Sequence, residues 1–145
     1  MRRLPAVLVA LVVTLVTTGT AYAVTEAGPN QDPIGPGLVT IDVGIDHSHF
    51  DLGTLRVRKG TMVRFVVHNH DPIDHELIVG DARVHAAHRI GTERRHPPIP
   101  GEVSVAPLTE ALTFYDFEAT GTIVYACHLP GHEAYGMHGE IKVEP

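Results

Sequence analysis

Residues 61–79 read TMVRFVVHNHDPIDHELIV, which predicts a strand, a turn and a second strand. Val63, Phe65 and Val67 fall on one face of the first strand, because successive side chains of an extended chain point to opposite faces. The tetrapeptide DPID contains residues that favour turns, and HELIV is an apolar run of strand length. The stretch is therefore typical of a β-protein with short strands and tight turns.

The same pattern continues in both directions along the chain. Further strands are expected at residues 39–45, 54–57, 102–105, 111–117, 122–126 and 139–143. Residues 81–101 fit no strand period, since their first half is compatible with a short helix and prolines stiffen their second half. The sequence thus predicts an all-β fold, a two-sheet antiparallel Greek-key sandwich with an irregular or short helical insertion around residues 81–101.

The N-terminal residues 1–23 predict a secretory signal peptide, with Arg2 and Arg3 before an apolar run and an Ala-Tyr-Ala ending. The alternative is a retained membrane anchor, but the apolar run is shorter than the roughly 20 residues that span a bilayer. Residues 24–37 are rich in Pro, Gly and polar side chains and are expected to form a flexible leader, which leaves 38–145 as one domain. We therefore expect export to the periplasm or the extracellular space, with association to the cell envelope only if the signal segment is retained.

The single cysteine lies in a stretch rich in metal-ligand side chains. Residues 126–141 read ACHLPGHEAYGMHGEI, so that Cys127 follows a strand and His132 and Met137 follow Cys127. A free thiol outside the cell is open to oxidation unless it is buried or bound to metal, and both alternatives remain here. Two His, one Cys and a weak axial Met form the ligand set of blue-copper centres. The second histidine must come from elsewhere, and His75, which opens HELIV, is the strongest candidate.

Two segments together resemble the cupredoxins, the small blue copper proteins. They are FVVHNHDPIDH (65–75) and YACHLPGHEAYGM (125–137), and the likeness runs over residues 39–143. The spacing of the ligand loop is most similar to that of rusticyanin and auracyanin. The resemblance implies one type 1 copper ion, with the ligands His75, Cys127, His132 and Met137.

Two neighbours of the first histidine ligand also bear on the site. Asn69 takes the place of a family asparagine, and the resemblance implies that it hydrogen-bonds across to the ligand loop and fixes it. Glu76 departs from the family, many members of which carry Asn or Ser directly after this histidine. A carboxylate near the metal would favour Cu(II) and lower the reduction potential, whereas one that points to solvent or forms a hydrogen bond leaves the potential open.

The chain has eleven histidines. If strand directions alternate, the loops after the first and third strands lie at one end, so that His47 and His49 come close to His68 and His70. We interpret these four as a polar rim around the copper site. The alternative is an additional metal site built on His47 and His49 with His68 or His70, because an H-x-H pair on a strand puts both rings on one face. The histidines of the insertion are expected to lie elsewhere: His85, His88 and His96.

The sequence therefore predicts a one-electron carrier and not an enzyme. The alternatives are an extracytoplasmic copper-binding or trafficking protein and a copper site with an open position for a small molecule. The pair Cys127-His128 also resembles the last copper loop of multicopper oxidases, but Ala126 stands where those enzymes carry a histidine, so oxygen reduction by this chain is not expected.

The expected partners of such a carrier are redox proteins that the sequence does not identify. Without residues 1–23 the chain holds 9 basic and 17 acidic residues, a net charge of −8 with neutral histidines. This acidity argues against nucleic acid as a partner. We expect a monomer, without stable insertion into a membrane once the signal segment is removed.

Overall fold

The structure, a computed structural model, describes residues 32–91, 95 and 97–145. The expected signal peptide, residues 1–23, and the first part of the expected leader lie outside these residues. The strands are β1 (Gly37–Asp46), β2 (His49–Phe50), β3 (Leu55–Arg58), β4 (Thr61–Asn69), β5 (His75–Gly80), β6 (Glu102–Val105), β7 (Glu110–Phe117), β8 (Gly121–Ala126) and β9 (His138–Glu144). The helices are α1 (Ala82–Ile90) and α2 (His132–Tyr135). Within the described residues, neither helix is long and apolar enough to cross a membrane.

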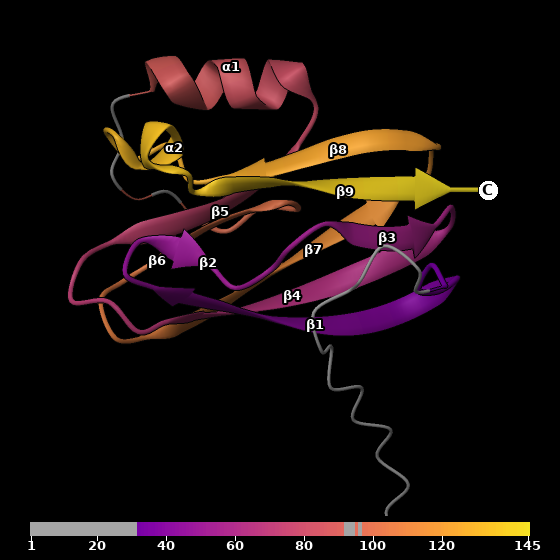
Figure 1. Ribbon diagram of the computed structural model, residues 1–145, viewed down its shortest axis with the longest axis horizontal. Helices are drawn as coiled ribbons and strands as arrows, with labels where there is room; N and C mark the ends of the chain where they lie inside the picture. Colours follow the sequence, from indigo (N-terminus) through magenta and orange to yellow (C-terminus); the bar gives the residue numbers. More distant parts are fainter. Residues whose placement is uncertain (1–31, 92–94, 96) are drawn as a thin grey trace, which may run out of the picture.

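The strands form two sheets packed face to face, with α1 on the outside of one of them (Figure 1). One sheet has the order β2-β1-β4-β7 and the other the order β3-β9-β8-β5-β6. This confirms the predicted β-sandwich with a short helix in the insertion. Sequence reasoning did not predict β2 and α2, which are two and four residues long.

The sheets are mixed, which corrects the prediction of a purely antiparallel sandwich. β1 pairs with β4 in parallel, and β3 pairs with β9 in parallel. The physical reason is a crossover, because the chain leaves the first sheet after β2, forms β3 in the second sheet and then returns as β4. β1 and β4 consequently end side by side, with Ile45 opposite Asn69.

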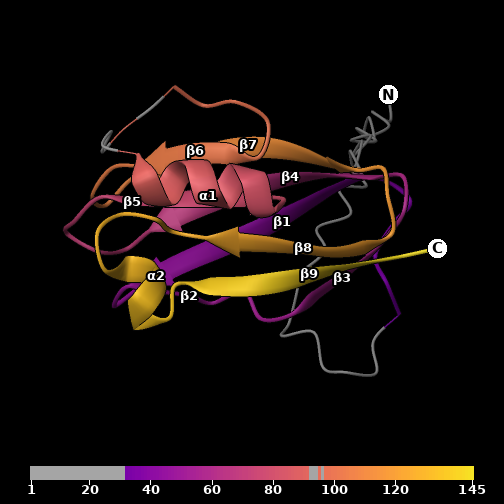
Figure 2. The ribbon, with the colours of Figure 1, turned by 90° about the horizontal axis from the view of Figure 1, so that it is seen from above.

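The core lies between the two sheets. Inward positions along β4 are buried and alternate with more exposed ones, as expected for a strand with one face on a core. β5 differs, since all six of its residues are buried. Helix α1 covers its outer face (Figure 2), and the contact is close enough that an added Cβ at Gly80 would lie 2.8 Å from Cβ of Val84. The apolar run HELIV thus reflects burial on both faces.

The end of the expected leader is attached to the domain. The N–H of Ile34 donates to the carbonyl of Arg56 at 2.9 Å, and the N–H of Arg58 donates to the carbonyl of Ile34 at 2.8 Å. These two bonds place residue 34 beside β3 as a parallel bridge to Val57. Backbone pairing with the sandwich is therefore present already at residue 34.

Candidate metal centre

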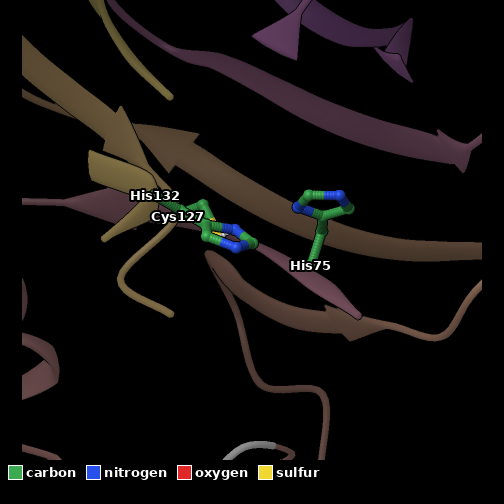
Figure 3. Close-up of side chains that lie close together, drawn as sticks. All are labelled: His75, Cys127 and His132. Atoms are coloured by element: carbon green, nitrogen blue, oxygen red, sulfur yellow. Dashed lines mark hydrogen bonds between the residues drawn. The ribbon is translucent and has the colours of Figure 1, made fainter. Parts of the chain in front are cut away.

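Three predicted ligands come together at one end of the sandwich. His75 is the first residue of β5, Cys127 follows β8 and His132 begins α2. Their ligand atoms all lie within 4.8 Å of one another, and no other group of three or more His, Cys, Asp or Glu side chains in the described part of the chain does so. Figure 3 shows His75 opposite Cys127 and His132, which lie side by side.

Cys127 is fully buried, with its Sγ 3.3 Å from Nδ1 of His132. Burial raises the pKa of the Cys127 thiol to about 12, against the opposing effect of the Leu129 and Glu76 backbone N–H groups that point at the sulfur. Because metals bind the thiolate, a cation must displace the thiol proton at this site.

One ring nitrogen of His75 is left without a hydrogen-bond partner in this cluster of ligands. Its Nε2 lies 2.8 Å from Oδ2 of Asp71, to which it donates as an N–H. Its Nδ1 is buried and has no hydrogen-bond partner among the described residues. A buried lone pair of this kind is costly unless a cation or a donor meets it. The pair of imidazoles and the thiolate therefore fit a metal ion, and a soft sulfur donor with two imidazoles favours copper.

Asp71 orients His75 and was not predicted from the sequence. Its carboxylate accepts the backbone N–H groups of His47 and Ser48, each at 2.8 Å, in addition to the ring of His75. Burial acts to raise the pKa of Asp71, but the hydrogen bonds from Ser48, His47 and His75 outweigh it and lower that pKa. The ionised carboxylate holds His75 in the tautomer that leaves Nδ1 unprotonated.

Met137 closes the ligand loop. Its N–H donates to the carbonyl of His132 at 3.1 Å, and its carbonyl accepts the N–H of Cys127 at 3.0 Å. Gly131 and Gly136 on either side of α2 have φ of 88° and 114°, a conformation that favours glycine. Met137 is fully buried in the same core cluster as Cys127, and its backbone bonds keep it next to Cys127 and His132.

Asn69 differs from what the resemblance implied, whereas Glu76 takes one of the alternatives left open for it, a hydrogen bond. The side-chain amide of Asn69 donates to the carbonyls of Ile73 and Ala106, so its hydrogen bonds stay away from the ligand loop. Its Oδ1 accepts the N–H of Asp71 and fixes the turn before His75. Glu76 makes the cross-connection instead, because its buried carboxylate accepts the backbone N–H of His128 at 2.8 Å.

The four histidines of the expected rim lie at the same end of the molecule. His47 and His49 flank the turn from β1 to β2, and His68 and His70 lie at the end of β4. His68 Nε2 is 3.1 Å from a carboxylate of β1 and its Nδ1 is 3.4 Å from a carboxylate of β7. The one ligand group in the described residues includes none of the four. An additional metal site among them stays a prediction.

His85 and His88 do not lie away from the site, which corrects that expectation. Nδ1 of His85 is 2.8 Å from Nε2 of His128, and the ring of His88 stacks on His128 with centroids 6.0 Å apart. The reason is the position of α1, which covers β5 and β8 next to the ligand loop. His96 lies outside the described residues. The sequence predicts no role for His128, because the contacts of its ring come from α1, a helix distant in sequence.

Comparison with known proteins agrees with this geometry. A model of the copper binding proteins of the plastocyanin/azurin family matches residues 38–144. A relative from Rubrivivax gelatinosus, "Copper-resistant cuproprotein CopI", is 34% identical over 136 residues, which cover 86% of this chain and 82% of the relative.

Solved structures with the same fold include an auracyanin and a variant of rusticyanin. A reduced auracyanin from Roseiflexus castenholzii superposes with a TM-score of 0.60 at 20% identity, over 73% of this chain and 97% of the auracyanin. A rusticyanin superposes with a TM-score of 0.59 at 18% identity, over 82% of this chain and 85% of the rusticyanin. At these sequence identities the similarity shows a shared fold and nothing more.

Proposed function

Because this chain belongs to the plastocyanin/azurin family of copper binding proteins, we propose that it is an exported type 1 copper protein that carries single electrons between redox partner proteins. The observation that supports the proposal is the ligand cluster of His75, Cys127 and His132 within 4.8 Å, with Met137 buried beside it. A copper ion bound there would supply one-electron chemistry by alternating between Cu(I) and Cu(II).

The protein's own residues keep the ligands in place and keep water out. His75, Cys127 and Met137 are buried, while His132 is half-buried. Their elements belong to a packed sandwich, so the ligand positions change little when the charge at the site changes. His132 is consequently the ligand through which an electron leaves toward a partner that docks at this end.

The experiment is to add Cu(II) to purified residues 32–145 and to record visible and electron paramagnetic resonance spectra. An intense visible band from thiolate-to-copper charge transfer is expected, with about one electron taken up per protein on reduction. Cys127→Ser should lose the band, while His70→Gln, at an exposed histidine of the same end, should keep it. A colourless protein, or a band that survives Cys127→Ser, refutes the proposal.

A second candidate function is copper handling in copper resistance. It is favoured by the relative from Rubrivivax gelatinosus, whose name states copper resistance. In this function the domain would hold or hand over the copper ion itself. The two candidate functions differ in how fast the protein releases copper. An electron carrier keeps Cu(I) in the presence of a mild Cu(I) chelator, whereas a copper-delivering protein releases it within minutes. Growth of a copper-sensitive bacterium that expresses the wild type or Cys127→Ser tests the cellular role directly.

A further inference from the structure

We propose that helix α1 is a clamp for the copper-ligand loop, and that His128 and Glu133 are the positioning residues through which it acts. The inference rests on the proposed function, because it concerns the same site. Each of the two residues directly follows a ligand, His128 after Cys127 and Glu133 after His132.

The spacing on the two sides of the clamp is complementary. His85 and Arg89 are four residues apart on α1, which puts them on one face of the helix. His128 and Glu133 are five residues apart, on the segment that runs from the end of β8 into α2. Figure 1 shows α2 below one end of α1, on the side where the loop leaves β8. One helix face thus meets both loop residues.

The first contact joins two buried rings. His85 Nδ1 lies 2.8 Å from His128 Nε2, and 2% of His85 remains exposed. The other ring nitrogen of His85 lies 3.1 Å from the carbonyl of Val124 in β8, which fixes the ring against the sheet. His88 stacks on the same His128 ring. The imidazole of His128 is therefore enclosed by α1.

The second contact is a two-point ion pair. Arg89 Nε donates to Glu133 Oε2 at 2.9 Å, and Arg89 Nη2 donates to Glu133 Oε1 at 2.5 Å. Such fork-shaped pairs fix orientation as well as distance. Glu133 Oε2 also lies 3.0 Å from Nδ1 of His128, which joins the two contacts into one network.

The backbone of His128 is held as well. Its N–H donates to the buried carboxylate of Glu76 in β5. With its ring bound by α1 and its N–H bound by β5, His128 has little freedom, and Cys127 is the residue before it. The clamp therefore limits movement of Cys127 and His132 in both oxidation states, and it must open before copper leaves.

The first test uses the metal-free protein, so that it does not depend on copper chemistry. Amide hydrogen exchange is measured for residues 127–137 in Arg89→Ala and His85→Phe, with Arg83→Ala as the control. Arg83 is on the same helix and its side chain is 94% exposed. The clamp predicts exchange about threefold faster in Arg89→Ala and about tenfold faster in His85→Phe. His85→Asn, whose side-chain amide can either accept a hydrogen bond from His128 Nε2 or donate one to it, should recover part of the protection.

The second test follows copper in the loaded protein. Loss of Cu(I) to a chelator should accelerate in Arg89→Ala and His85→Phe in the same order as amide exchange, while Arg83→Ala stays at the wild-type rate. The clamp is wrong if both variants match Arg83→Ala in amide exchange and in copper release. If exchange accelerates but the copper site carries no electron, the clamp stands and the proposed electron-carrier function fails.

Discussion

At the scale of single residues, Asp71 and His75 determine the electrostatics of the site. Asp71 is ionised, buried and hydrogen-bonded to the ring nitrogen of His75 that does not face the other ligands. A carboxylate in this position increases the basicity of the imidazole and stabilises positive charge at the metal. The negative charge of Asp71 therefore stabilises bound Cu(II) more than bound Cu(I).

Replacing Asp71 by Asn should raise the reduction potential by about 50–100 mV, as Coulomb's law gives for loss of one charge at an effective dielectric constant near 20. Voltammetry of the copper-loaded protein measures the shift. Asp74→Asn is the matched control, because Asp74 lies in the same turn but pairs with Arg95. Equal potentials for Asp71→Asn and Asp74→Asn would show that the carboxylate of Asp71 does not act on the metal.

Cys127 should make copper binding dependent on pH. Its pKa of about 12 keeps the thiol protonated, whereas burial and the neighbouring His75 lower the pKa of His132. Above neutral pH the thiol is then the source of the proton that binding releases. The affinity for Cu(I) should rise about tenfold per pH unit between about pH 7 and 9. Calorimetry in buffers of different ionisation enthalpy counts the protons, and a slope that persists in Cys127→Ser contradicts this assignment.

At the scale of elements, the sequence predicts the strands well because each has one apolar face or an apolar run. β4 shows the alternation directly, and β5 reads as a continuous apolar run because α1 covers it. The three clustered ligands were also predicted, since Cys127 and His132 lie in one loop and His75 opens a strand. Asp71 and His128 were missed, because their roles depend on His47, His85 and other groups far away in sequence.

The pair β8 and β9, which carries the ligand loop, should be sensitive at Gly139. An added Cβ there would lie 2.7 Å from Cε1 of Tyr125, whose hydroxyl donates to the carbonyls of Leu52 and Gly53. Gly139→Ala should lower the free energy of unfolding by about 1–3 kcal/mol through overpacking. Urea unfolding measures the change. Gly53→Ala, where an added Cβ meets no described atom within 4 Å, should stay close to the wild type.

At the scale of the whole molecule, the parallel pairing of β1 with β4 assembles the site from distant parts of the chain. Both strands end at the metal side, so the turn after β1 reaches Asp71 in the turn after β4. At the same time β3 lies at the edge of the other sheet, beside β9. The segment around Ile34 covers that edge.

A chain that begins at residue 38 should be less stable than one that begins at residue 32. The shorter chain loses both backbone bonds of Ile34 and the packing of its side chain against the core. The expected loss is about 2–3 kcal/mol of unfolding free energy. Denaturant midpoints of the two purified chains check it. Unchanged midpoints would mean that residues 32–37 contribute nothing to the domain.

The unpaired Nδ1 of His75 also bears on how long each copy of the protein survives. Without a metal ion, the folded form keeps this buried nitrogen unsatisfied, so a ligand that binds there stabilises folded over unfolded chains. Proteases cleave unfolded molecules, and molecules without copper unfold more often than those with copper. The half-life of the protein would then follow the copper supply, with degradation removing copies that never received the metal.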